Sequence, residues 1–75
     1  MTKLPSISGR GAIKALRKAG FVVVRQKGSH VRLKKTTKEG PIKLTVPVHS
    51  TLKKGTLSRI IKDAGLTVEE FVELL

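Results

Sequence analysis

Two consecutive runs of this sequence alternate apolar and polar side chains with a period of two, and this pattern constrains the fold more than any other feature. In residues 29–35, Val31 and Leu33 alternate with His30, Arg32 and Lys34. The second run carries its apolar set at Ile42, Leu44, Val46 and Val48. Because successive side chains of a strand point to opposite faces, each run predicts a strand with one apolar and one polar face.

A third strand is predicted before these two. Residues 21–26 are rich in β-branched apolar side chains, and Lys27-Gly28 can form a short turn into the next run. A looser loop over residues 36–41 is expected to lead to the last strand. Since Pro47 cannot donate a ladder hydrogen bond, that strand should lie at a sheet edge.

Helical patterns flank the three strands. Ser8 is an expected N-cap for a helix that Gly20 ends. Thr56 is expected to cap a second helix ended by Gly65, and Thr67 with Glu70 forms a capping box for a short last helix. The predicted apolar stripes are Ala12, Ala15, Leu16 and Ala19 for the first helix, Leu57, Ile60, Ile61 and Ala64 for the second, and Val68, Phe71, Val72 and Leu75 for the last.

These elements predict an α+β fold. A three-stranded antiparallel sheet with one apolar face needs a cover, and the helices supply it from one side. With 75 residues, the chain has room for one domain, spanning 1–75. It has no Cys, so neither a disulfide nor a Cys-based zinc site can support the fold.

The composition excludes several functions. The longest apolar run, residues 21–24, is far too short to span a bilayer, and no apolar signal-peptide stretch opens the chain, so we expect a cytoplasmic protein with no membrane partner. Four of the five acids lie beyond residue 62, which disfavours a two-metal nuclease. We expect no metal and no small-molecule cofactor.

The charge is strongly positive and unevenly distributed. Sixteen Lys and Arg oppose five Asp and Glu, for a net charge of +11. Residues 1–54 hold fourteen Lys and Arg and one acid, a net of +13, whereas residues 55–75 carry a net of −2. Such a basic body attracts polyanions, and nucleic acid is the expected partner. With only two aromatic residues, base stacking cannot dominate recognition.

The polar face of the predicted sheet is the candidate site. If Val31 and Leu33 face the helices, His30 faces solvent among cations, just after a tight turn. A neutral imidazole can take the proton from a ribose 2′-hydroxyl, and cations can hold the phosphate. The predicted catalytic residue is His30, and the predicted RNA-binding residues are Arg25, Lys27, Gly28, Ser29, Arg32, Lys34 and Lys43.

Two other functions compete with a ribonuclease. A noncatalytic basic RNA-binding module would use the same face without depending on His30, although such modules usually expose more aromatic side chains. A DNA-binding domain would place the helix over residues 56–64 in a groove. That helix offers only Ser58, Arg59, Lys62 and Asp63 for base recognition.

Five segments together closely resemble the HicA family of bacterial and archaeal toxins, over roughly residues 5–75. The segments are Lys18-Ala19-Gly20-Phe21, Arg25-Gln26-Lys27-Gly28-Ser29-His30, Val46-Pro47-Val48-His49, Lys54-Gly55-Thr56-Leu57 and Ala64-Gly65-Leu66. No single tripeptide is specific, but the series in this order and spacing is.

The resemblance implies a double-stranded-RNA-binding-domain-like fold and a type II toxin that acts as a ribosome-independent mRNA interferase in the stress response. The family's catalytic histidine, in its Gly-Ser-His motif, corresponds to His30. The implied partners are an mRNA substrate and a HicB-type antitoxin that covers the active site. His49 matches a recurrent family position, for which a structural hydrogen bond is favoured over catalysis.

Overall fold

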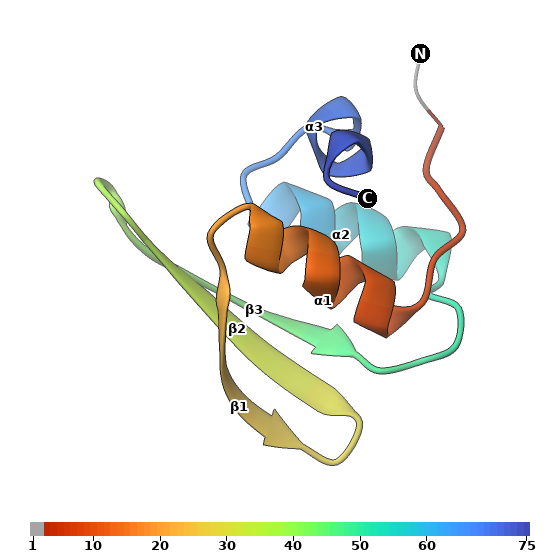
Figure 1. The fold of residues 1–75 in the computed structure, drawn as a ribbon, viewed down its shortest axis with the longest axis horizontal. Coiled ribbons are helices and arrows are strands. Elements are labelled where there is room, and N and C mark those ends of the chain that lie inside the picture. Colours follow the sequence, from red (N-terminus) through yellow and green to blue (C-terminus); the bar gives the residue numbers. More distant parts are fainter. Residues whose placement is uncertain (1–2) are drawn as a thin grey trace.

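The computed structural model describes residues 3–75, which form a helix, three strands and two further helices (Figure 1). The elements are α1 (Gly9–Lys18), β1 (Val22–Lys27), β2 (His30–Thr37), β3 (Gly40–Pro47), α2 (Lys54–Asp63) and α3 (Val68–Glu73). The strands pair antiparallel in the order β1-β2-β3, so β3 with its Pro47 lies at an edge as predicted. This confirms the α+β class and is consistent with a double-stranded-RNA-binding-domain-like fold.

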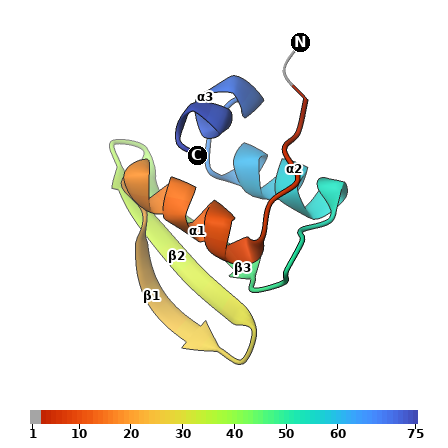
Figure 2. The same ribbon diagram turned by 45° about the vertical axis from the view of Figure 1, so that its right-hand side comes forward.

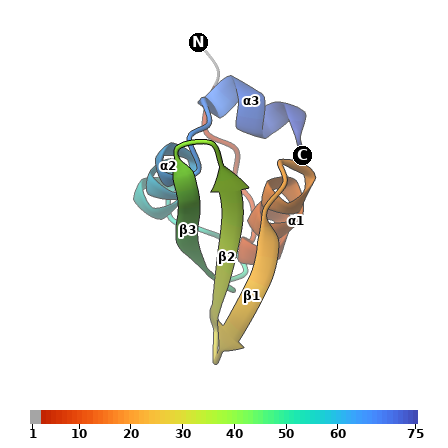
Figure 3. The same cartoon turned by 90° about the vertical axis from the view of Figure 1, so that its left-hand side faces the viewer.

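The helices form one layer over one face of the sheet, and the other face is open (Figures 1 and 3). Four of the six residues on the predicted apolar face belong to the buried core, namely Val31, Leu33, Leu44 and Val46. The other two, Ile42 and Val48, are partly buried against it. The four core residues pack in one cluster with the predicted stripes of α1 and α2 and with Phe21 and Phe71. Burial of this apolar face is the main force that holds the helices on the sheet.

The helix ends follow the predicted capping signals in four places. Gly65 ends the second helix with a φ of 75°, and the Leu66 N–H donates to the Ile61 carbonyl at 3.1 Å. The Ser8 Oγ accepts the Gly11 N–H at 3.0 Å, and the Thr67–Glu70 capping box is formed. Gly20 takes a φ of 104°, and the Phe21 N–H donates to the Leu16 carbonyl at 3.0 Å. This bond closes α1 with a Schellman turn and directs Phe21 back into the core.

The N-terminus of α2 differs from the prediction. Lys53, not Thr56, is the N-cap, and no side chain caps the helix there. The chain is fixed just before this point, because Leu52 is buried and its N–H donates to the Ile7 carbonyl at 2.8 Å. Helix α2 therefore begins directly after that anchor, and Thr56 lies within its first turn.

The loop predicted over residues 36–41 is instead a tight hairpin. Strands β2 and β3 pair as far as Thr37 and Gly40, leaving only Lys38 and Glu39 in the turn. The Thr37 Oγ1 donates to the Gly40 carbonyl at 2.6 Å, and Gly40 has a φ of 113°. Strands β2 and β3 therefore stay paired beyond the residues in which apolar and polar side chains alternate. The local hydrogen bond and the positive φ of the glycine make this tight turn possible.

Smaller differences occur at the strand and helix ends. The β1–β2 turn is Gly28-Ser29, rather than Lys27-Gly28, and β3 stops at Pro47, leaving Val48 and His49 outside the strand. In α3 only Phe71 is buried, because this short helix lies across the end of the helical layer (Figure 2). Leu75, which follows α3, is exposed, and Val68 and Val72 are half-buried, contrary to the predicted stripe.

The start of α1 packs directly on the end of β3. Gly9 is buried, and its N–H donates to the His49 carbonyl at 2.9 Å. A Cβ built on Gly9 would collide with the Pro47 carbonyl oxygen. A glycine is therefore required at this contact, which sets the distance between the helical layer and the sheet.

Within residues 3–75, no helix has the length and apolar character needed to cross a membrane.

Candidate nucleic-acid interface

The open face of the sheet contains three rows of residues that span all three strands, as set by the pairing register. In antiparallel strands, directly paired residues share a face. One row contains Lys27, His30 and Pro47, the next contains Arg25, Arg32 and Thr45, and the third contains Val22, Lys34 and Lys43. The predicted basic residues of the three strands therefore lie on one face around His30.

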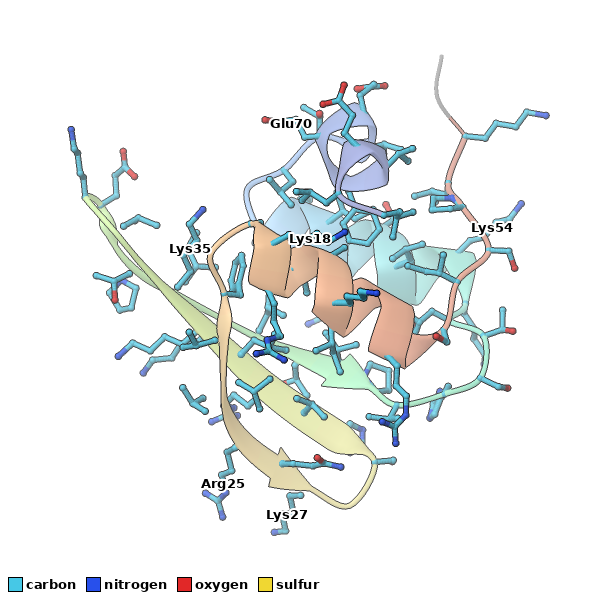
Figure 4. All side chains as sticks on the ribbon, viewed as in Figure 1. Lys18, Arg25, Lys27, Lys35, Lys54 and Glu70 are labelled. Atoms are coloured by element: carbon cyan, nitrogen blue, oxygen red, sulfur yellow. The ribbon has the colours of Figure 1, made fainter. Side chains whose placement is uncertain are left out.

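His30 is the first residue of β2 and is exposed. It lines a shallow hollow of about 330 Å³ together with Arg25, Lys27, Arg32 and Thr45. The side chains of Arg25 and Lys27 point away from the helical layer (Figure 4). The hollow is thus an imidazole-and-guanidinium surface with no acid in its lining, which suits a phosphodiester.

The turn that precedes His30 is held in place by its backbone. Gly28 has a φ of 58°, and a Cβ at this position would meet no neighbouring atom. Glycine is therefore favoured by the left-handed backbone conformation and not by a lack of space for a side chain. The Ser29 carbonyl accepts the Val48 N–H at 2.6 Å. This bond ties the turn to the segment after β3, so His30 projects from a fixed backbone while both Gly28 and Ser29 remain exposed.

A second hollow, of about 420 Å³, continues from His30 over the edge of β3 toward α2. It shares His30 and Thr45 with the first hollow and adds Lys43 and the α2 side chains Thr56, Arg59 and Asp63. The Arg59 Nε lies 3.9 Å from the Asp63 Oδ2, and both side chains are exposed. The sequence prediction missed this extension, although the polar i, i+3, i+7 spacing of Thr56, Arg59 and Asp63 was a usable signal.

The remaining polar groups do not converge on His30. Among the residues 3–75, the imidazole has no hydrogen-bond or ion-pair partner, and no cluster of three or more His, Cys, Asp and Glu could hold a metal. His49 is exposed and lines neither hollow beside His30. Its carbonyl, which accepts the Gly9 N–H, links α1 to the end of β3.

Cations also differ in how deeply they lie on this face. Lys34 is half-buried, whereas Arg25, Lys27, Arg32 and Lys43 are exposed. Long cationic side chains can cover apolar surface with their stems and keep the charged groups in water. The site can therefore bind a polyanion along the sheet and present an imidazole to it.

The order α-β-β-β-α, followed by the short helix α3, and the basic open sheet face place this chain among small α+β proteins of the double-stranded-RNA-binding-domain-like kind. A family model described as the HicA toxin of bacterial toxin–antitoxin matches residues 9–66, and the chain belongs to this family. It is thus a toxin of a toxin–antitoxin system, which implies an antitoxin partner. No curated protein matches the chain.

Proposed function

We propose that this toxin is a metal-independent endoribonuclease that cleaves mRNA independently of the ribosome, with His30 as its general base. The observation that carries the proposal is the position of His30, an exposed imidazole in a hollow whose other side chains include three cations. A ribonuclease that uses the substrate's own 2′-hydroxyl needs little more than a positioned base and groups that bind phosphate.

The reaction follows from the chemistry of these groups. Neutral His30 takes the proton from a ribose 2′-hydroxyl, and the 2′-oxygen attacks the adjacent phosphorus. The bond from phosphorus to the 5′-oxygen breaks, and the leaving oxygen takes a proton from water. The products are a 2′,3′-cyclic phosphate and a 5′-hydroxyl, and His30 returns its proton to solvent.

The cations have a separate role in this scheme. Arg25 and Arg32 lie opposite each other across β1 and β2, beside His30, where guanidinium groups can donate to the non-bridging phosphate oxygens. Lys27 lies directly opposite His30. Lys34 and Lys43 lie farther along the sheet and bind the flanking backbone of the RNA. Gly28 and Ser29 keep the approach to His30 open.

A HicB-type antitoxin is the proposed inhibitor, in keeping with the family's toxin–antitoxin description. Because the His30 hollow is shallow and exposed, a bound protein can block RNA access without changing the fold of the toxin. We propose that the toxin acts in the cytoplasm, where mRNA is present.

The test compares His30→Ala with His49→Ala, which removes the other imidazole and keeps the backbone carbonyl that α1 uses. Purified proteins are incubated with end-labelled mRNA in the presence of a metal chelator. Since a general base contributes about 10²–10⁴ in rate, only His30→Ala should lose cleavage, with its fold and most of its RNA affinity retained. Undiminished cleavage by folded His30→Ala would contradict the proposal.

A second test addresses the nucleophile. An RNA with a single 2′-deoxyribose at a mapped cleavage site should resist cutting at that position only, and the fragments of the unmodified RNA should carry cyclic phosphates. Cleavage of an all-deoxy strand would exclude this mechanism.

A noncatalytic RNA-binding module is the second candidate. The observation that favours it is that no side chain among residues 3–75 orients the His30 ring by a hydrogen bond. It predicts that the wild-type protein binds mRNA and leaves it intact. The same incubation distinguishes the two functions.

A further inference from the structure

The outer edge of β1 is an unpartnered and unusually apolar strand edge. Among residues 3–75, strand β1 pairs only with β2, and all six of its residues are exposed. Val22, Val23 and Val24 are 57%, 45% and 51% exposed, and they are three of the four exposed large hydrophobic residues in the described part of the chain. Unpaired backbone groups beside exposed valines form a template for another strand.

A groove lies beside this edge, on the helical side of the sheet. It has a volume of about 440 Å³ and is lined mainly by residues of α1 and β1. These two elements lie next to each other in Figure 3. Its apolar lining consists of Ile13, Val23, Val31 and Val48, and its polar lining consists of Arg10, Lys14, Arg17 and Gln26. The groove is separate from the His30 hollow, with which it shares no residue.

The charges around β1 have one sign on both faces of the sheet. On the helical side, Arg10, Lys14 and Arg17 follow one another at helical spacing, and α1 contains no acid to neutralise them. On the open side, Arg25 and Lys27 point away from the helices (Figure 4). A strand laid along β1 would send alternate side chains to these two faces and would meet cations on each.

We propose that β1 and the α1–β1 groove are a docking surface for an extended acidic segment of a partner protein, which adds as a fourth strand. Its apolar side chains would occupy the groove, and its carboxylates would face the cations of α1 and β1. The bulge of β1 between Val23 and Arg25 divides the new ladder into two short stretches. The family description supplies only the existence of a protein antitoxin. The natural occupant is a segment of that antitoxin other than the part that covers the His30 hollow.

The same features disfavour two other occupants. A second copy of this chain would bring Arg25 and Lys27 against their own like charges. An RNA strand would gain phosphate contacts from α1, but the four aliphatic side chains in the groove offer no hydrogen bonds or aromatic faces to its bases. An acidic segment with apolar side chains satisfies both parts of the lining.

The binding test uses the full chain labelled with ¹⁵N and a synthetic Glu-Val peptide of about twelve residues, long enough to form a strand. Its repeat is Val-Val-Glu-Glu, so each face of the added strand carries both Val and Glu. Matched peptides with Ser in place of Val, or Lys in place of Glu, separate the apolar and acidic contributions. Titration of the Glu-Val peptide should shift the amides of residues 10–17 and 22–27 and slow hydrogen exchange along β1. Comparable binding of either control peptide, or shifts confined to the His30 hollow, would overturn the proposal.

A matched pair of variants localises the effect. Lys14→Glu and Lys62→Glu each reverse one exposed helical cation and change the net charge equally, but only Lys14 lines the groove. Lys14→Glu should weaken Glu-Val peptide binding by about tenfold or more, whereas Lys62→Glu should leave it within about twofold. Equal losses would show that the peptide responds to net charge alone, and would also overturn the proposal.

Two further measurements distinguish the other occupants. Self-association of the free chain through β1, seen as the same amide shifts on raising protein concentration, would assign the edge to a second copy. Stronger shifts of the groove amides with an RNA oligonucleotide than with the Glu-Val peptide would assign it to RNA. RNA cleavage is measured separately in the same samples, so failure of this proposal and failure of the ribonuclease proposal give different results.

Discussion

The two faces of the sheet follow opposite rules of cross-strand pairing. On the helical face, the apolar residues Leu33 and Leu44 are direct partners, as are Val31 and Val46. On the open face, the direct partners include Arg25 with Arg32 and Lys34 with Lys43. Apolar pairs stabilise a sheet, whereas like charges placed directly opposite each other destabilise it.

This difference separates what the fold needs from what the proposed function uses. Within residues 3–75, the buried strand residues of the core all lie on the covered face. The open face departs from the most stable arrangement, and departures of this kind are expected at functional sites. The pairing register decides which side chains belong to which face, since a one-residue slip would exchange the two sets.

The largest expected contrast is between two adjacent residues of β2. Leu33 is fully buried on the covered face, so Leu33→Ala should lower the free energy of unfolding by about 2–5 kcal/mol. Arg32 is exposed on the open face, so Arg32→Ala should change it by less than about 0.5 kcal/mol. Urea unfolding monitored by circular dichroism checks both, and similar losses in the two variants would refute the division between the faces.

The next contrast concerns how closely the helical layer approaches the sheet. Gly9→Ala places a methyl group against the Pro47 carbonyl and should cost about 1–3 kcal/mol or more. Gly11→Ala is the matched control, because its Cβ would lie 3.4 Å from the Ser8 Oγ and Ala favours a helix. Thermal unfolding should therefore show a lower midpoint for Gly9→Ala only. A normal midpoint there would mean that α1 can shift away from β3 at little cost.

Much of this arrangement could be predicted from the sequence, because period-two and helical patterns report directly which side chains are buried. The alternation around Val31 and Leu33 predicted both faces of β2, and Ser8, Gly20, Gly65 and the Thr67–Glu70 pair marked four helix ends. The rows of the open face also follow from alternation, once the strands are paired. The catalytic role of the open face is a separate proposal, supported by the HicA resemblance and the chemistry of His30.

The missed features depend on contacts between distant segments. The position of the α2 N-terminus depends on Leu52 and its hydrogen bond to Ile7, which no local pattern reveals. The β1 bulge and the second hollow depend on the pairing register and on where α2 lies beside β3. The long β2–β3 hairpin extends into a stretch where Lys, Thr and Gly hide the alternation, so its polar sequence resembled a loop.

A third contrast tests whether the open face binds RNA through its charges. If Arg32 contacts one phosphate, Arg32→Ala should reduce the slope of log affinity against log salt by about 0.7 for single-stranded RNA. Lys62→Ala, on α2 outside both hollows, should leave the slope unchanged. Fluorescence anisotropy of a labelled RNA bound to the His30→Ala protein measures the slope without cleavage. Equal slopes for the two variants would place the RNA elsewhere.

The smallest expected effect tests the opposed charges themselves. Lys43 is the direct partner of Lys34, so Lys43→Glu replaces a repulsion with an attraction and should raise the free energy of unfolding by about 0.2–1 kcal/mol. Lys38→Glu makes the same change of net charge in the β2–β3 turn, outside the paired strands, and is the control. Added salt should stabilise the wild type more than Lys43→Glu, because it screens a repulsion in the first and an attraction in the second. RNA affinity should fall in Lys43→Glu even as stability rises. If instead stability and affinity fell together, the like charges on the open face would have a structural role, and the contrast between the two faces would not hold.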